Sequence, residues 1–262
     1  MRDKALDLEY FETQNDAFIR KIIYHKRKGS IKMVDTKFKF KEFVDGIAGA
    51  CLIAAALLTP FLRDWRTKWG ATDAEVHLSL PGDNLVPHPK WGWTHAITIR
   101  ASAAEVWPWL VQMGQGRGGM YSYEWLENLV GCDIHNADRI IPEFQHLEVG
   151  DGIWLHPKVS IPITAIEPCR ALVLHVRTDT QTGSAFELTD TMPEKYIDMS
   201  WEFFLDEHDE GTTRLISRWR GDYDQSRGNA VIYRVFIEPI SFVMDRKMLL
   251  GIKRRAEAAA FP

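Results

Sequence analysis

Residues 106–140 read VWPWLVQMGQGRGGMYSYEWLENLVGCDIHNADRI, which joins a tryptophan-rich helix, a glycine-rich turn, a second aromatic helix and a dense polar cluster. Ser102 precedes the first helix with Glu105 three residues later, the spacing of a capping box. Gly114 ends that helix, and Gly131 closes the second, expected over residues 122–130, in the manner of a left-handed carboxyl cap. The stretch predicts two short helices that brace the core of a mixed fold.

Strands are expected on both sides of this stretch. One precedes it at 94–100, where His95, Ile97 and Ile99 share a face. Branched and aromatic residues predict five more at 152–156, 160–166, 171–177, 196–205 and 212–220. A long amphipathic helix over 229–260, kinked at Pro239, ends the chain. This order predicts an α+β fold, in which a curved antiparallel sheet wraps around the long C-terminal helix and an N-terminal apolar helix comes first.

With this order of elements, residues 98–140 resemble the START-like superfamily, also called SRPBCC or polyketide cyclase/dehydrase-like, and in particular its bacterial membrane-anchored members. The resemblance covers about residues 76–256. It implies a helix-grip fold with a cavity between the sheet and the last helix, which members use for lipids, sterols, polyketides and other apolar molecules. Fold alone does not give function, because relatives include transfer proteins, receptors, cyclases and oxygenase domains.

The amino-acid composition indicates which classes of partner are disfavoured. The chain has 262 residues, 45% of them apolar, and a net charge of −4. An acidic balance argues against nucleic acid as a partner, because binding to phosphates relies on basic residues. The three cysteines are too few for a disulfide framework, and buried free thiols are favoured over a Cys132–Cys169 bridge.

Four segments follow from the changes in composition. Residues 1–43 form a basic tail that is expected to be mobile, with Met33 as an alternative start. Residues 44–63 are predicted as a transmembrane helix, residues 64–93 as a linker, and residues 94–260 as the START-like domain.

The membrane prediction rests on residues 46–62, which carry no charge. As a helix they span about 26 Å, close to the hydrocarbon thickness of about 30 Å. The basic residues before the segment predict a single-pass protein with a cytoplasmic N-terminus and an exported globular domain. A cleaved signal peptide and a buried helix of the soluble body are the two alternatives.

The glycine-rich run at 114–119 follows a helix, whereas a dinucleotide fingerprint follows a strand, so we interpret its glycines as turn geometry. Arg117 within it has two interpretations. Its guanidinium is a candidate clamp for a ligand carboxylate or phosphate, and it is also placed for an internal pair with Glu124 or Glu127.

The polar cluster at 132–139 offers candidate catalytic residues. His135 beside Asp138 has the chemistry of a general base, with Tyr123 assisting. The alternative is that the short polar side chains cap turns and that Asp138 pairs with Arg139. Zinc through Cys132 and His135 lacks two further ligands at recognisable spacing, so no metal and no other cofactor is predicted.

Aromatic and methionine side chains supply the candidate ligand-binding surface. Tyr121 lies with Tyr123 and Trp125 either at a pocket entrance or in the core. In the fold that the resemblance implies, the cavity wall comes from the inner sheet face and the last helix. The candidates there are Trp201, Phe203, Trp219, Met244 and Met248.

Three functions from different classes remain open at this stage. The leading hypothesis is binding or transport of a hydrophobic small molecule, such as a lipid, isoprenoid or polyketide-like compound, near a membrane. The second is a cyclase- or isomerase-like enzyme without metal that uses His135. The third is a structural membrane module with a solid interior.

Overall fold

The structure is a computed structural model that describes residues 36–186, 193–208 and 211–260. Met33 and residues 1–35 of the predicted tail lie outside the described residues. The chain divides into two compact units, residues 1–41 and residues 42–262. Of the first unit, residues 36–41 are described and form the first turns of helix α2. The architecture below is that of the second unit.

The helical segments in the described part of the chain are α2 (Thr36–Leu58), η1 (Pro60–Leu62), α3 (Arg63–Thr67), α4 (Asp73–His77), α5 (Ala103–Val111), α6 (Glu124–Leu129), η2 (Pro142–Phe144), α7 (Arg227–Val231), η3 (Ile232–Ile237) and α8 (Glu238–Ala260). The strands are β1 (Trp91–Ile99), β2 (Gly152–His156), β3 (Val159–Glu167), β4 (Ala171–Asp179), β5 (Tyr196–His208) and β6 (Thr212–Tyr223).

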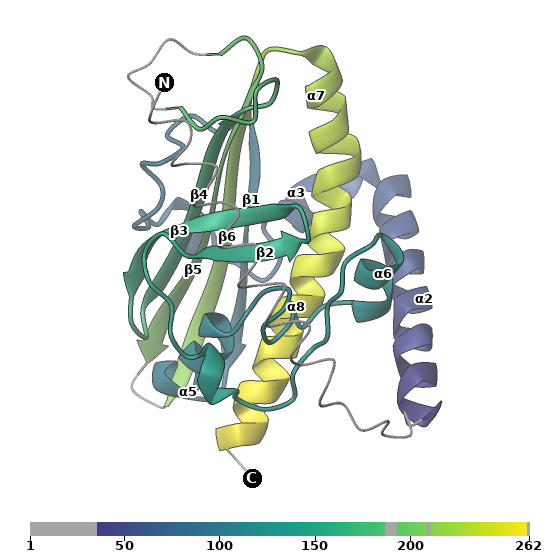
Figure 1. Cartoon of the computed structure of the whole chain (residues 1–262), viewed down its shortest axis with the longest axis vertical. Coiled ribbons are helices and arrows are strands. Elements are labelled where there is room, and N and C mark those ends of the chain that lie inside the picture. The colour runs from purple at the N-terminus through teal and green to yellow at the C-terminus, as the bar shows by residue number, and fades with distance from the viewer. Residues whose placement is uncertain (1–35, 187–192, 209–210, 261–262) are drawn as a thin grey trace, which may run out of the picture. The chain divides into compact units, whose positions relative to one another are not determined.

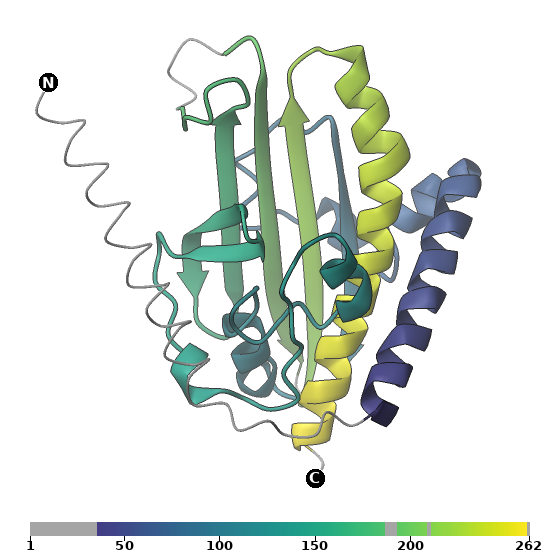
Figure 2. The same ribbon diagram turned by 45° about the vertical axis from the view of Figure 1, so that its right-hand side comes forward.

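The six strands form one antiparallel sheet in the spatial order β1-β6-β5-β4-β3-β2. The sheet curls, and α8 lies along its inner face, with α2 on the far side of α8 (Figures 1 and 2). The first strand therefore pairs with the last one, although about 110 residues separate them in the sequence. The predicted α+β helix-grip fold, with a curved sheet around a long C-terminal helix, is confirmed.

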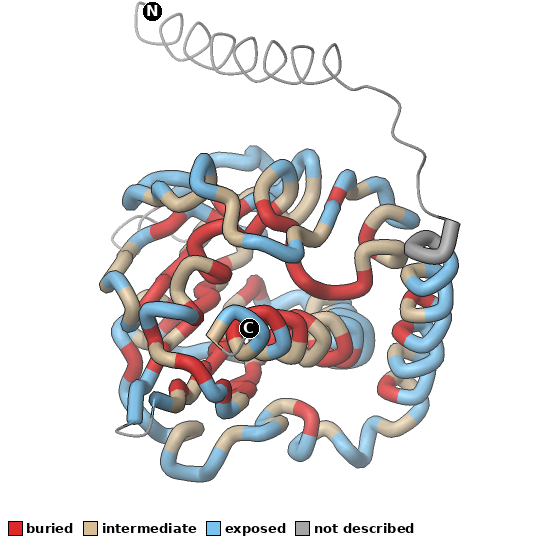
Figure 3. Tube along the Cα trace, turned by 90° about the horizontal axis from the view of Figure 1, so that it is seen from below, coloured by how far each residue is buried: buried red, intermediate tan, exposed pale blue. Residues whose placement is uncertain are grey.

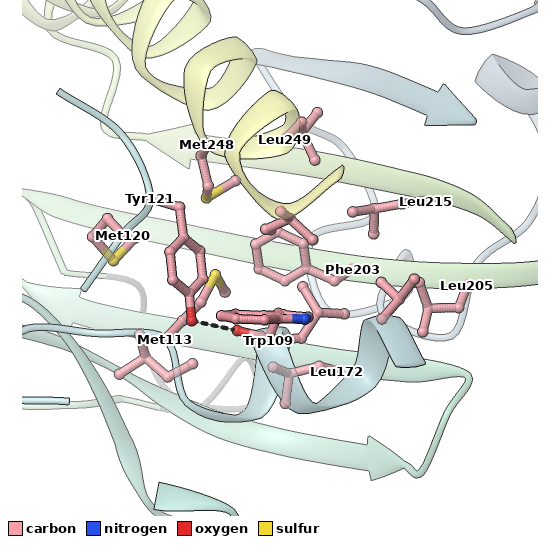
Figure 4. Close-up of a cluster of buried hydrophobic side chains, with 14 of the residues drawn as sticks. Trp109, Met113, Met120, Tyr121, Leu172, Phe203, Leu205, Leu215, Met248 and Leu249 are labelled. Atoms are coloured by element: carbon pink, nitrogen blue, oxygen red, sulfur yellow. Dashed lines mark hydrogen bonds between the residues drawn. The ribbon is translucent and has the colours of Figure 1, made fainter. Parts of the chain in front are cut away.

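The core lies between the inner face of the sheet and α8, where buried positions concentrate (Figure 3). Phe203 of β5 and Leu215 of β6 are fully buried there, and Met248 of α8 is 2% exposed. Tyr121 and Trp109 close this region from the side of the two short helices (Figure 4). This part of the interior is filled with packed side chains.

The capping and turn signals of residues 98–140 are present in the structure. Glu105 accepts hydrogen bonds from the backbone N–H and the hydroxyl of Ser102, both at 2.8 Å, at the start of α5. Gly131 has a φ of +93° after α6, as its predicted role in closing that helix requires. The three cysteines are free thiols.

Residues 44–63, predicted as one transmembrane helix, form two helical pieces. Helix α2 ends at Leu58, and Pro60 begins η1. No single helix in the described ranges is long and apolar enough to cross a bilayer, but residues 40–58 and 60–67 together pass that test across a bend of 92°. Arg66 holds the bend, because its guanidinium donates to the carbonyl oxygens of Ala56 (2.8 Å) and Thr59 (2.7 Å).

Residues 64–90 are held against the outer face of the sheet by arginines of β6. Arg218 pairs with Asp83 at 2.7 Å and also donates to backbone carbonyls of the α4 region. Arg214 pairs with Glu75 at 2.6 Å, and Arg220 reaches Asp83 at 3.3 Å. The prolines and turn residues of this segment predicted a linker. In the structure, long-range ion pairs hold the segment in place against the sheet.

The C-terminal helix is interrupted where a kink at Pro239 was expected. The π-helical segment η3 ends at Ile237, and the backbone N–H of Glu238 donates to the carbonyl of Tyr233, five residues earlier. Proline lacks an N–H and its ring crowds the carbonyl four residues before it, so the irregularity falls in the turn preceding Pro239.

Candidate ligand-binding site

A row of aromatic rings runs along the inner face of β5, β6 and β1 and ends on η3. The ring centroids of Trp201 and Trp219 are 5.1 Å apart, and those of Trp219 and Trp93 are 5.5 Å apart. Trp93 then lies 5.6 Å from Trp91, which stacks on Tyr233 at 4.9 Å. We call these five residues the aromatic row.

Strand geometry places these rings side by side. Trp91 and Trp93 are two residues apart on β1, so their side chains point to the same face of the sheet. The register aligns Trp93 with Trp219 and Trp219 with Trp201 across three neighbouring strands. Gly221 makes room for the outermost ring, because a Cβ built there would lie 2.2 Å from Nε1 of Trp91.

Three indole nitrogens of the row are buried and have no acceptor among the described residues. They belong to Trp91, Trp93 and Trp219. Trp91 is 4% exposed and Trp93 is 6% exposed. Trp201 differs, because its indole donates to the Ser217 hydroxyl at 3.1 Å. A buried donor without an acceptor costs about 1–3 kcal/mol, so three in one cluster call for an explanation.

A buried polar chain borders the row. The ring of His95 stacks under Trp93 at 5.7 Å, and its Nδ1 lies 2.5 Å from a carboxylate oxygen of Asp245 on α8. Its Nε2 lies 2.8 Å from the carbonyl oxygen of Arg66. Both contacts are with oxygen atoms, so the ring is held between α8 and the α3 segment. Ser217 donates to the other oxygen of Asp245 at 3.1 Å, which links β6 to the same chain.

The chemistry of the row suits an apolar molecule that carries hydrogen-bond acceptors. Indole rings present apolar faces together with one donor each and no acceptor. Burial raises the pKa of the Tyr233 phenol, and the nearby Asp224 raises it further, so Tyr233 stays neutral. Carbonyl, ether or hydroxyl oxygens on a flat or flexible apolar body match this surface.

Two of the predicted cavity-wall residues, Trp201 and Trp219, belong to the aromatic row. Phe203 and Met248 lie in the packed core outside the row, and Trp201 also belongs to that core cluster. Met244 packs in a separate cluster with Tyr123 and residues of α2, and its carbonyl accepts a hydrogen bond from Ser122. The predicted wall is therefore divided between the row and solid core.

Arg117 and Tyr121 are held by backbone groups. The Arg117 guanidinium donates to the carbonyls of Val111 (3.1 Å) and Phe144 (2.6 Å) and lies over the Phe144 ring. Burial lowers its pKa, partly offset by the charge of Asp151. In the described part of the chain neither Glu124 nor Glu127, the expected partners, pairs with Arg117, and Glu124 contacts His135 and Asn136 instead. Tyr121 is 2% exposed and its hydroxyl donates to the Trp109 carbonyl at 3.1 Å.

The three candidate catalytic residues lie apart from the row. His135 is largely exposed, and its two ring nitrogens lie 3.1 Å from Glu124 and 3.2 Å from Asp133. Asp138 pairs with Arg255 at 3.0 Å, whereas an Arg139 pair was expected. Tyr123 is 6% exposed and packs against α2, with the Lys247 ammonium 4.9 Å from its ring centroid.

The sequence interpretation missed Trp91, Trp93 and Tyr233, and it gave no role to Asp245. The signal was present in WGWTH at 91–95, where two tryptophans and a histidine alternate as on one face of a strand. Pro87 and Pro89 just before it led to a linker prediction through residue 93. The Tyr233 signal was hidden, because a π-helical turn shifts the helical phase on which the pattern depends.

No known protein-family model matches the chain. No curated protein matches it either. Several solved structures are similar over part of it. A conserved protein from Geobacillus kaustophilus is 14% identical, with 64% of this chain and 95% of that chain covered and a TM-score of 0.35.

CalU16 from Micromonospora echinospora is 17% identical, with coverage of 64% and 86% and a TM-score of 0.29. The KanY protein is 9% identical, with coverage of 65% and 99% and a TM-score of 0.31. Structural similarities with these TM-scores do not indicate what this chain binds.

Proposed function

We propose that this protein binds or carries a hydrophobic small molecule, of a lipid, isoprenoid or polyketide-like kind, and that it does so beside a membrane. The observation that carries the proposal is the set of three buried indole donors without acceptors in the aromatic row. A ligand oxygen that accepts from one of them removes the cost of leaving that donor unpaired.

Apolar burial supplies the larger part of the expected affinity. Each 100 Å² of ligand surface removed from water contributes about 2.5 kcal/mol before the cost of immobilising the ligand. The hydrogen bonds to indole then orient the ligand along the row. Tyr233 stacks on Trp91 at one end, so the row closes on the π-helical segment η3.

The test uses 8-anilinonaphthalene-1-sulfonate, an aromatic probe with sulfonate acceptors, titrated into the full-length chain. Binding near the row is read by energy transfer from tryptophan to the probe. We expect saturable binding that weakens about 2–10-fold in Trp93→Phe, which keeps the ring but loses one donor. Trp154→Phe is the matched control, because Trp154 is 44% exposed on β2 and lies outside the row.

Two results contradict the proposal. The first is the absence of saturable binding to the folded wild-type chain, which fits a structural protein with a solid interior. The second is equal weakening by Trp93→Phe and Trp154→Phe, which places the probe elsewhere. Native mass spectrometry of the purified chain complements the titration. A co-purified ligand adds a discrete mass to the protein, and we expect Trp93→Phe to lower the fraction of protein that carries this added mass.

Membrane association through residues 46–62 is the second part of the proposal. It is supported by the large apolar side chains that α2 leaves exposed, among them Phe43, Ile47, Leu52 and Leu58. A lipid-like ligand has low solubility in water and is concentrated in membranes. A protein that binds such a ligand therefore encounters it more often when it lies next to a membrane.

A further inference from the structure

Helix α2 has an inner face that belongs to the folded body. Gly46 lies against the Trp125 ring, and a Cβ on Gly49 would come within 2.9 Å of Leu126 and of Tyr123 on the neighbouring α6 segment. Ala56 is 6% exposed in the same stripe. Small residues at this spacing let the helix approach closely, so α2 is packed along one side.

Charged contacts fasten the middle of this packed helix and the bend that follows it. Asp45, the tenth of its 23 residues, pairs with Lys247 of α8 at 3.0 Å. Beyond the helix end, Arg66 is 3% exposed and donates to the carbonyls of Ala56 and Thr59, and Arg63 pairs with Glu238 of α8 at 2.9 Å. Straightening the helix across the bend would separate the buried Arg66 and Glu238 from these partners, which is strongly unfavourable for buried charged groups.

The outer surface around the bend is apolar and comes from five elements, α2, η1, α3, η3 and α8. The ring centroids of Trp65 of α3 and Phe242 of α8 are 5.6 Å apart, and Arg63 pairs with Glu238, so the bend lies beside the first turns of α8. Figures 1 and 2 show α2 and the long C-terminal helix running side by side. We call the exposed apolar residues here the elbow surface: Phe43, Val44, Ile47, Leu52, Leu58, Phe61, Leu62, Trp65, Ile232, Val235, Phe236 and Ile240.

The exposed fractions are high for side chains of this kind. Leu58 is 79% exposed, Phe61 78% and Trp65 56%. Monomeric soluble proteins rarely leave this many large apolar residues together in contact with water. Trp65 beside exposed aliphatic residues also matches the preference of tryptophan for the membrane–water interface.

The charge of the sequence that precedes the apolar part of α2 indicates which partner covers the elbow surface. Residues 20–41, which lead directly into the apolar part of α2, contain nine Lys or Arg and one Asp, a net charge of +8. A basic segment joined to an apolar helix face suits an anionic lipid surface, where each basic residue adds electrostatic attraction.

We propose that the elbow surface lies in one leaflet of an anionic bilayer and that α2 does not cross it, so that both ends of α2 remain on the same side of the membrane. The proposal rests on the membrane association proposed above and specifies its geometry. It does not depend on the ligand of the aromatic row.

Topology is tested in cells with the full-length chain. On a background of Cys51→Ser, Cys132→Ala and Cys169→Ala, single cysteines are placed before α2 (Ser30→Cys) and after the bend (Lys68→Cys). A membrane-impermeant maleimide is applied to intact cells and to inverted membrane vesicles. We expect both positions to react in the same preparation. Reaction from opposite sides shows a crossing helix and overturns the inference, while leaving membrane association intact.

Affinity for lipid is tested with the purified full-length chain and extruded vesicles of phosphatidylcholine, with and without one quarter phosphatidylglycerol. We expect stronger binding to the anionic vesicles and a fall of about tenfold in the partition constant for Trp65→Ser. Trp154→Ser is the matched control, because Trp154 is also a partly exposed tryptophan but lies on β2, outside the elbow surface.

The outcomes separate the two proposals. Absence of binding to either vesicle overturns membrane association and this inference together. Equal losses in Trp65→Ser and Trp154→Ser show that the elbow surface is not the contact and overturn this inference alone. Concentration-dependent dimers in light scattering that Trp65→Ser abolishes, without vesicle binding, assign the surface to a second copy of the chain.

Discussion

Gly221 is the most informative position for testing the aromatic row, because adding one methyl group there acts on a single ring. A Cβ at residue 221 would lie 2.2 Å from Nε1 of Trp91, whereas ordinary van der Waals contacts begin at 3.4 Å. The indole in Gly221→Ala therefore has to move by about 1.2 Å. It is 4% exposed and stacked on Tyr233, so its neighbours have to move with it.

The expected loss of stability follows from two opposing effects. Overpacking a well-packed interior costs about 1–3 kcal/mol. Replacing a glycine within a strand by alanine returns about 0.5–1 kcal/mol, because the unfolded chain loses freedom. Gly221→Ala should therefore lower the free energy of unfolding by about 1–2 kcal/mol, with a fall in Tm of about 2–8 °C for a domain of this size.

Urea unfolding followed by tryptophan fluorescence measures this loss, and near-ultraviolet circular dichroism reports the coupling between the stacked rings. Gly228→Ala is the matched control, because a Cβ there meets only the Ser226 hydroxyl at 3.4 Å and should leave stability unchanged or slightly higher. If Gly221→Ala is as stable as Gly228→Ala and keeps the wild-type spectrum, the close packing of Trp91 on β6 is wrong.

Three further predictions concern buried charges. Burial raises the pKa of Glu202 from 4.5 to about 7, so its contribution to stability is present below pH 4.5 and is lost as pH rises through 7. Relative to wild type, the free energy of unfolding of Glu202→Gln should rise by about 1–3 kcal/mol between pH 5 and 7.5, as measured by urea unfolding. Parallel pH profiles of the two proteins contradict this. Arg218→Met should cost about 3 kcal/mol and expose residues 75–83 to amide exchange, because it removes the nearer of the two guanidinium partners of Asp83; unchanged exchange there would show that other contacts hold the segment. Asp245→Asn should cost about 3–5 kcal/mol, because it leaves His95 in a buried site without its carboxylate; Asp222→Asn, at a half-buried position of β6, is the comparison, and equal losses argue against a special role for the buried pair.

The elements of the fold were predictable because their signals are local. Alternating apolar residues in 196–205 and 212–220 predicted two strands that the structure extends by three residues each. Ser102 and Glu105 predicted the start of α5 for the same reason, since a capping box involves residues three apart. Local periodicity also predicted the long C-terminal helix, apart from its π-helical turn.

The candidate site was only half predictable, because it is assembled from strands distant in the sequence. Trp201 and Trp219 were recognised as inner-face residues from the pattern of their own strands. Their neighbours Trp93 and Trp91 come from β1, which pairs with β6 across more than a hundred residues. No local pattern shows which strand lies beside which, so the length of the row and its unpaired indoles were not visible.

By itself the sequence determined the order of strands and helices, the apolar character of residues 46–62 and the basic charge before them, because each depends on neighbouring residues. Only the tertiary structure decided that α2 packs by its glycine face, that the chain turns by 92° after Leu58, and that His95 meets Asp245. These features depend on contacts that close long loops, such as the 150 residues between His95 and Asp245. These contacts contribute free energy only when the whole body folds. Hydropathy therefore predicted one transmembrane helix, whereas the folded chain has two helical pieces joined by a bend.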